Sequence, residues 1–190
     1  MQHADRHLAA AVTFLNSVGI KTDILPGATG FLEHVRIIEG RLEVDLRCPV
    51  SNLLHEAGHL ALVPGRWRHL MSGDLSAGME RMFAEAKSLD LEPDSPLSRA
   101  LVQCSDPEAT AWAWAAGAHL GIPPELVILD SEYDGSGAEI RCQLLPTLTA
   151  TRRTGGYLGV HGLAHAGFCA LREGLPLPMY PKMIRWLQIH

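Results

Sequence analysis

The stretch Ser51-Asn-Leu-Leu-His55-Glu56-Ala-Gly-His59-Leu-Ala-Leu62 predicts more about this chain than any other. Histidines four residues apart lie one above the other on a helix, so His55 and His59 can reach one ion at about 2.0–2.1 Å each. Glu56 is displaced by about 100° from His55 around the helix, so it can reach a water on the ion without binding the ion. We therefore expect His55 and His59 to bind zinc and Glu56 to act as the catalytic base.

The predicted helix also has a separate apolar face, which lies opposite the histidines. At about 100° per residue, five apolar side chains fall within an arc of roughly 120°; they are Leu53, Leu54, Ala57, Leu60 and Ala61. Ser51 is expected as the N-cap, and Gly58 leaves room for the backbone of another element. The alternative is that the two histidines are ordinary surface residues of an amphipathic helix.

A catalytic zinc ion usually has three protein ligands and one water, so a third ligand is needed. Gly65 stands where the metzincin pattern requires a histidine, and this excludes that class. The better candidate is Glu108, in the first turn of a helix predicted from about Pro107 to Leu120. The alternative for Glu108 is a capping box, because Ser105 lies three residues before it.

A second pair of histidines, His161 and His165, has the same spacing in a glycine-rich segment. Either one is a candidate for the third ligand, or for a group that polarises a substrate carbonyl opposite the metal. Tyr157 is a further candidate for that electrophilic role. The alternative is that these histidines have only a structural role.

The pattern over the whole chain predicts an α+β fold that is mostly helical, with a small antiparallel sheet beside the metal-binding helix. A hairpin is expected from the alternation at 35–37 and 42–46. If the strand at 41–47 lies at a sheet edge, it could bind an extended peptide by strand addition. Further helices are expected at 4–18, 76–89, 97–103, 123–129, 157–171 and 183–189, whereas no element is predicted for 132–156.

The length of 190 residues predicts a single domain over 1–190, with 66–104 as an insertion, a lid or a substrate wall. The methionines of that segment could equally belong to the core; they are Met71, Met79 and Met82. The four cysteines are far apart, with no Cys-x-x-Cys pair, so a cysteine zinc site is not expected.

The composition bears on partners and location. A hydrophobic content of 47% and a charged content of 19% indicate a packed core. The net charge of −5 gives no basic footprint for nucleic acid. With neither a membrane-spanning run nor a secretory signal, we expect a cytoplasmic protein.

The region from about residue 41 to 123 resembles the gluzincins, a family of zinc metallopeptidases. A strand leads into His-Glu-x-Gly-His, and a later helix opens with Glu108 and ends in Leu-Gly-Ile-Pro. Within that family it is similar to the small cytoplasmic ImmA/IrrE-type metallopeptidases. The resemblance implies a zincin-like fold, zinc bound by His55, His59 and Glu108, Glu56 as the base, and cleavage of a protein such as a repressor. Residues 66–104 lengthen the usual gap, and no DNA-binding helix-turn-helix is present.

Together these features predict a zinc-dependent hydrolase, a metallopeptidase that acts on a peptide or protein. Zinc would lower the pKa of a bound water, and Glu56 would take the proton of that water. One alternative is a non-catalytic zinc-binding or protein-interaction module, which a fourth protein ligand such as His161 would indicate. Another is a zinc amidohydrolase that acts on a non-peptide substrate. The oligomeric state is not predicted.

Overall fold

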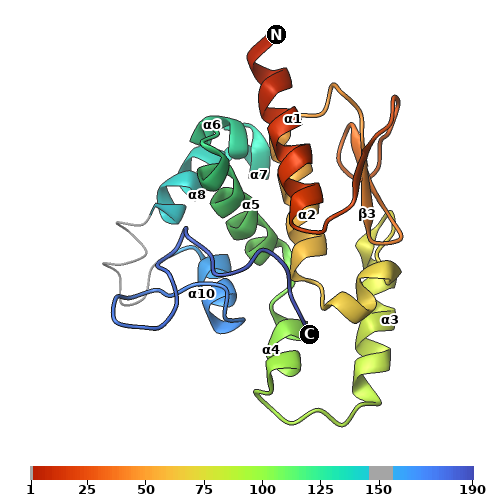
Figure 1. Ribbon diagram of the computed structural model, residues 1–190, viewed down its shortest axis with the longest axis vertical. Helices are drawn as coiled ribbons and strands as arrows, with labels where there is room; N and C mark the ends of the chain where they lie inside the picture. The colour runs from red at the N-terminus through yellow and green to blue at the C-terminus, as the bar shows by residue number, and fades with distance from the viewer. Residues whose placement is uncertain (1, 146–155) are drawn as a thin grey trace.

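The computed structural model describes residues 2–145 and 156–190. Within them the chain has an α+β fold, as predicted: it is mostly helical, with a small three-stranded sheet at one side of the molecule (Figure 1). The strands are β1 (Thr22–Ile24), β2 (Val35–Ile38) and β3 (Arg41–Val44). The helices are α1 (Gln2–Ser17), α2 (Val50–Leu62), the 3-10 helix η1 (Gly65–Leu70), α3 (Leu75–Lys87), α4 (Pro96–Val102), α5 (Asp106–Leu120), α6 (Pro124–Val127), α7 (Glu132–Gly135), α8 (Gly137–Leu144) and α10 (Leu158–His165).

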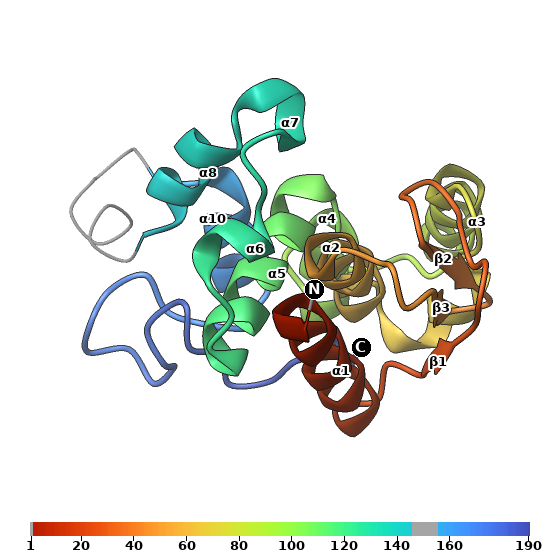
Figure 2. The same cartoon turned by 90° about the horizontal axis from the view of Figure 1, so that it is seen from above.

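Helix α2 carries the His-Glu-x-x-His motif through the middle of the fold. Seen from above, it lies between the sheet with α3 on one side and the group of α5, α6 and α10 on the other (Figure 2). Its apolar face is buried as predicted, and Leu53 and Leu60 are inaccessible to solvent. A Cβ atom at Gly58 would lie 2.6 Å from the carbonyl oxygen of Ala109 on α5. The predicted close approach at Gly58 is therefore confirmed, and it brings α5 against α2.

The sheet is mixed, and not antiparallel as predicted. Strands β2 and β3 form the expected antiparallel hairpin, but β1 adds to β3 in parallel and gives the order β1-β3-β2. Only the first of the three residues of β1 is buried, so this strand shows no apolar alternation that a sequence pattern could reveal. Because β3 is the central strand, strand addition along 41–47 is excluded. The outer edge of β2 is in part covered already, since the Gly73 amide donates to the Ile37 carbonyl at 2.9 Å.

The C-terminal residues do not form the predicted helix over 183–189; they form an irregular segment with several bends. The Gln188 amide donates to the carbonyl of Ala61 near the end of α2 at 2.8 Å, and the indole of Trp112 donates to the Trp186 carbonyl at 3.0 Å. These long-range hydrogen bonds satisfy the backbone groups that a helix would have paired locally. We call residues 184–190 the C-terminal strap.

Two further predictions differ in detail. Helix α2 begins one residue before Ser51, with Pro49 at the N-cap, so the Ser51 hydroxyl is buried inside the first turn and makes no hydrogen bond. Helix α10 ends at His165, and the left-handed Gly167 (φ 80°) follows soon after, which stops the helix well before residue 171. In the region without a predicted element, α7 and α8 form, whereas residues 146–155 lie outside the described part of the chain.

Candidate metal centre

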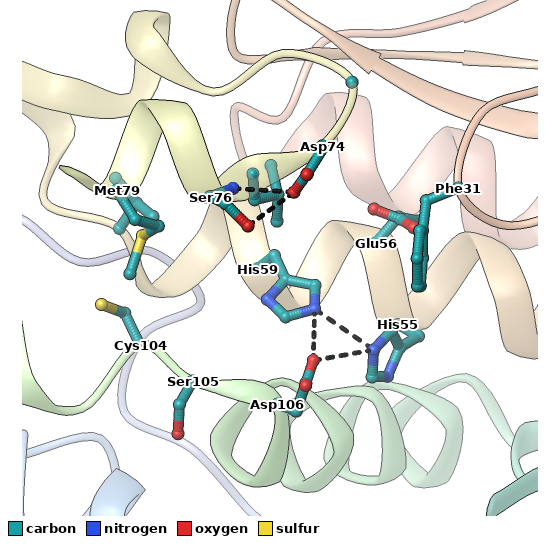
Figure 3. Close-up of a pocket in the computed structure, with 13 residues that line it drawn as sticks. Phe31, His55, Glu56, His59, Asp74, Ser76, Met79, Cys104, Ser105 and Asp106 are labelled. Carbon is teal, nitrogen blue, oxygen red and sulfur yellow. Dashed lines mark hydrogen bonds and ion pairs between the residues drawn. The ribbon is translucent and has the colours of Figure 1, made fainter. Parts of the chain in front are cut away.

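Three potential metal ligands from two helices converge on one point. The Nε2 atoms of His55 and His59 on α2 are 3.2 Å apart. A carboxylate oxygen of Asp106, the first residue of α5, lies 3.7 Å from the His55 Nε2 atom and 3.1 Å from that of His59 (Figure 3). Within residues 2–145 and 156–190, these three side chains form the one group of His, Cys, Asp or Glu whose ligand atoms are close enough to share an ion. We call His55, His59 and Asp106 the metal group.

The spacing of the three atoms fits a tetrahedral ion. With bonds of about 2.0–2.1 Å, the ligand atoms of a tetrahedral site lie roughly 3.3 Å from one another. The three separations are close to that value. Two imidazoles and one carboxylate suit zinc, and imidazole also suits copper, iron and nickel. The three side chains could therefore hold a divalent transition-metal ion.

Asp106 carries the charge of this group. The adjacent His55 and His59 rings hold the pKa of its carboxyl well below the usual range by hydrogen bonding, so the side chain is an anion at neutral pH. The two histidine side chains are only 20% and 12% exposed, whereas Asp106 is 77% exposed. A cation could thus enter from the Asp106 side and meet the recessed imidazoles.

Glu108, the predicted third ligand, has a different place. The carboxylate of Glu108 accepts hydrogen bonds from the amide of Ser105, at 3.2 Å, and from the Ser105 hydroxyl. The capping box that the sequence offered as the alternative is therefore confirmed. Side chains two residues apart on a helix point about 200° away from each other around its axis. When Glu108 turns back to cap the helix, Asp106 therefore faces α2. The Ser105-x-x-Glu108 pattern assigns Glu108 to the cap. It could therefore have indicated that Asp106, the other acidic residue of the first turn, is the candidate ligand.

Glu56 lies beside the metal group and is only 6% exposed. It lines the same cavity as His55 and His59, and in Figure 3 it lies beside Phe31, away from Asp106 on α5. Burial raises the pKa of the Glu56 carboxyl, although the nearby histidines partly oppose the change. A carboxylate with a raised pKa accepts a proton more readily at neutral pH, and this suits a general base.

Two cavities meet at the metal group. The first has a volume of about 550 Å³, and the second about 440 Å³. Both are lined by Phe31, His55 and Asp106, so the metal group lies where they adjoin. Each of the other lining residues belongs to only one of the two cavities. In the first these include Glu56, Asp74, Ser76 and Met79; in the second they include Thr110, Val127, Tyr133 and Tyr157.

The segment 66–104 forms one wall of the first cavity, through residues such as Asp74 and Met79. Met71 and Met82 are instead fully buried in the core. Met71 and Met82 therefore belong to the core, as one interpretation of the segment had it, whereas Met79 lines the cavity. The structure gives it the helices η1, α3 and α4.

Of the other predicted site residues, one lies at the site and two lie away from it. Tyr157 lines the second cavity, next to the metal group. His161 and His165 are exposed on α10 and line neither cavity. The glycines of α10 let it press against the beginning of α5, where Gly162 meets the Glu108 side chain. That contact does not direct the two histidines to the site.

Tyr133 is a site residue that the sequence patterns did not indicate. Its hydroxyl lies 2.8 Å from the Thr110 hydroxyl and 3.4 Å from Nδ1 of His55. Tyr133 has a positive φ of 55° in the short helix α7, so no apolar periodicity places it. The nearest signal is the Asp134-Gly135 turn pair that follows it.

Comparison with known proteins identifies no relative: no family model, no curated protein and no solved structure matches this chain. Among the described residues, no helix is long and apolar enough to cross a membrane.

Proposed function

We propose that this protein is a zinc-dependent hydrolase with a zincin-like fold, and that it cleaves peptide bonds. The observation that carries the proposal is the group of His55, His59 and Asp106, which adjoins a cavity that also holds the buried Glu56. A motif met by chance would not require a carboxylate from another helix, at ligand distance, beside both histidines. The proposal changes one expectation, because Asp106 replaces Glu108 as the third ligand.

In this proposal His55, His59 and Asp106 hold the ion, and Glu56 moves the proton. Bound zinc would supply Lewis-acid chemistry, which lowers the pKa of water and polarises a carbonyl. Glu56 takes a proton from the attacking water and delivers it to the leaving amine. Its raised pKa favours the first transfer, because the protonated carboxylic acid is easier to form in a buried place than in water.

Two observations weigh on the alternatives. No fourth His, Cys, Asp or Glu joins the three ligands in the described parts of the chain, and an open position is typical of catalytic rather than structural zinc. The two cavities on either side of the metal group favour an extended substrate such as a peptide over a small amide enclosed in one pocket.

The proposal is tested in two steps. The purified protein is first analysed for metals by mass spectrometry, and about one zinc per chain is expected, lost in His55→Ala. The metal-loaded protein and its Glu56→Gln variant are then incubated with a mixed peptide library, and new termini are identified. Cleavage that disappears in Glu56→Gln while zinc is retained supports the mechanism. Full cleavage by that variant, or the absence of metal after zinc is supplied at neutral pH, contradicts it.

A further inference from the structure

The short helix α7 has an unusual backbone at the edge of the metal group. Tyr133, Asp134 and Gly135 follow one another with φ values of 55°, 56° and 85°. Left-handed backbone is rare for residues other than glycine, and rarer for a bulky side chain. The turn is held by the Glu132 carboxylate, which accepts from the Leu129 amide at 3.0 Å. Such a backbone persists where surrounding contacts require it, and here it carries the phenol of Tyr133 to α2 and α5.

The hydrogen bonds around Tyr133 have a defined direction. The Thr110 hydroxyl donates to the Asp106 carbonyl oxygen, one turn earlier in α5, at 2.9 Å. A hydroxyl has one proton, so the bond between Thr110 and Tyr133 must have the phenol as donor. The Tyr133 oxygen then has lone pairs for the ring of His55, and its neighbour there is Nδ1 at 3.4 Å. His55 is therefore the donor in that bond.

This direction determines the tautomer of His55. A neutral imidazole with its proton on Nδ1 has a lone pair on Nε2, and Nε2 is the atom that faces His59 and Asp106. The chain of bonds thus runs from one ligand on α2 to the backbone of another ligand on α5.

We propose that Tyr133 and Thr110 form a positioning relay that holds His55 in the tautomer and orientation needed for metal binding. The relay occupies the outer side of the ring, the position from which a hydrogen-bond acceptor orients a metal-binding histidine. It rests on the metal group of the proposed function, and not on hydrolysis. Tyr133 and Thr110 are positioning residues, since they act through His55 and Asp106.

The test measures metal affinity in the full chain, with cobalt(II) and zinc in competition with a chelator. Tyr133→Phe, which removes only the hydroxyl, should weaken binding by about 10–100-fold, the range found for outer partners of metal ligands. The visible spectrum of bound cobalt should change as well, because the ring of His55 loses its orientation. Thr110→Val should act in the same direction, and Thr110→Ser, which keeps the hydroxyl, should restore affinity.

The matched control is Tyr180→Phe. The Tyr180 hydroxyl is also buried against α5, where it donates to the carbonyl of Ala111 at 2.9 Å, but Tyr180 lines neither cavity of the metal group. This variant should bind cobalt as the unaltered protein does. An equal loss of affinity in Tyr180→Phe and Tyr133→Phe would overturn the relay, because it would mean that the loss of any buried hydroxyl on α5 matters and the bond to His55 does not.

A measurement without substitution covers the case in which a variant fails to fold. Nitrogen-15 NMR of the zinc-loaded protein at neutral pH distinguishes the two tautomers of His55, and the proton should be on Nδ1. A proton on Nε2 would overturn the relay. If the unaltered protein binds no cobalt, the proposed function and the relay both fail. If it binds cobalt and Tyr133→Phe binds equally well, with the same spectrum, only the relay fails.

Discussion

Two histidine pairs with the same four-residue spacing have very different surroundings in this protein. His55 and His59 are recessed on α2 and face the carboxylate of Asp106, whereas His161 and His165 are exposed on α10. No Asp, Glu or Cys of the described residues completes a metal group with the second pair. The comparison teaches that the spacing makes a pair able to bind an ion, but the residues packed opposite the pair decide whether it has a site.

The largest effect expected from this comparison is on metal content. His55→Ala removes one of three ligands and should reduce bound zinc from about one per chain to near zero, measured by mass spectrometry after dialysis. His161→Ala, the matched change in the exposed pair, should leave the zinc content unaltered. Loss of zinc in His161→Ala, with retention in His55→Ala, would reverse the assignment of the two pairs.

The second prediction concerns the partner that distinguishes the pairs. Asp106→Asn keeps the shape of the side chain but removes its charge, and should weaken zinc binding by more than the 10–100-fold typical of outer partners. Glu108→Gln should leave zinc affinity within a few fold, because that side chain caps α5. Glu108→Ala, which removes the accepting oxygens that Gln would keep, should instead lower the stability of the fold by about 0.5–2 kcal/mol, the range for a lost cap. Titration with a chelator and chemical unfolding measure the two effects, and zinc lost in Glu108→Gln alone would restore it as the third ligand.

The third prediction tests how closely α2 and α5 must approach. Gly58→Ala places a methyl group against the backbone at Ala109, which cannot move aside as a side chain could. We expect the free energy of unfolding to fall by about 1–3 kcal/mol, as for other overpacked sites. Gly65→Ala is the control, since its nearest neighbour would be 3.9 Å away, and it should change stability by less than about 0.5 kcal/mol. Equal stability of the two variants in urea would show that the helices have room to separate.

The smallest effect concerns the burial of Glu56. Because burial raises the pKa of Glu56 in the folded protein, ionising it costs stability, and this cost grows as the pH rises above the unfolded value of about 4.3. Metal-free Glu56→Gln should therefore melt at a higher temperature than the unaltered protein at pH 7, and the difference should disappear below about pH 4. Calorimetry at several pH values checks the sign. A lower melting temperature for Glu56→Gln at pH 7 would mean that the carboxylate stabilises the fold.

The sequence was sufficient where a local pattern controls the structure. The apolar arc predicted α2, alternation predicted the β2–β3 hairpin, and the run closed by Gly121 predicted α5, whose C-cap is left-handed as that residue allows. The choice between Asp106 and Glu108 was harder, because it depends on which side chain turns back to cap the helix. Both carboxylates lie in one turn, so spacing along the chain does not separate them.

The remaining differences come from contacts between distant residues. Strand β1 exists because β3 provides a parallel neighbour, and Tyr133 reaches His55 across 78 positions of the sequence. The predicted helix at 183–189 is replaced by the C-terminal strap, because α2 and η1 offer hydrogen-bond partners that a helix cannot use. A single sequence contains these residues, but it does not show which of them meet.

The C-terminal strap also sets an order of events during synthesis. Arg68, just after α2, donates to the carbonyl of Gln188, which is 120 positions later in the chain. At about 5–20 residues per second, a ribosome needs roughly 6–24 s to make that interval. All three proposed metal ligands and Glu56 emerge before the strap exists. The nascent chain can therefore meet metal ions while the last turn of α2 still lacks the contacts that complete it.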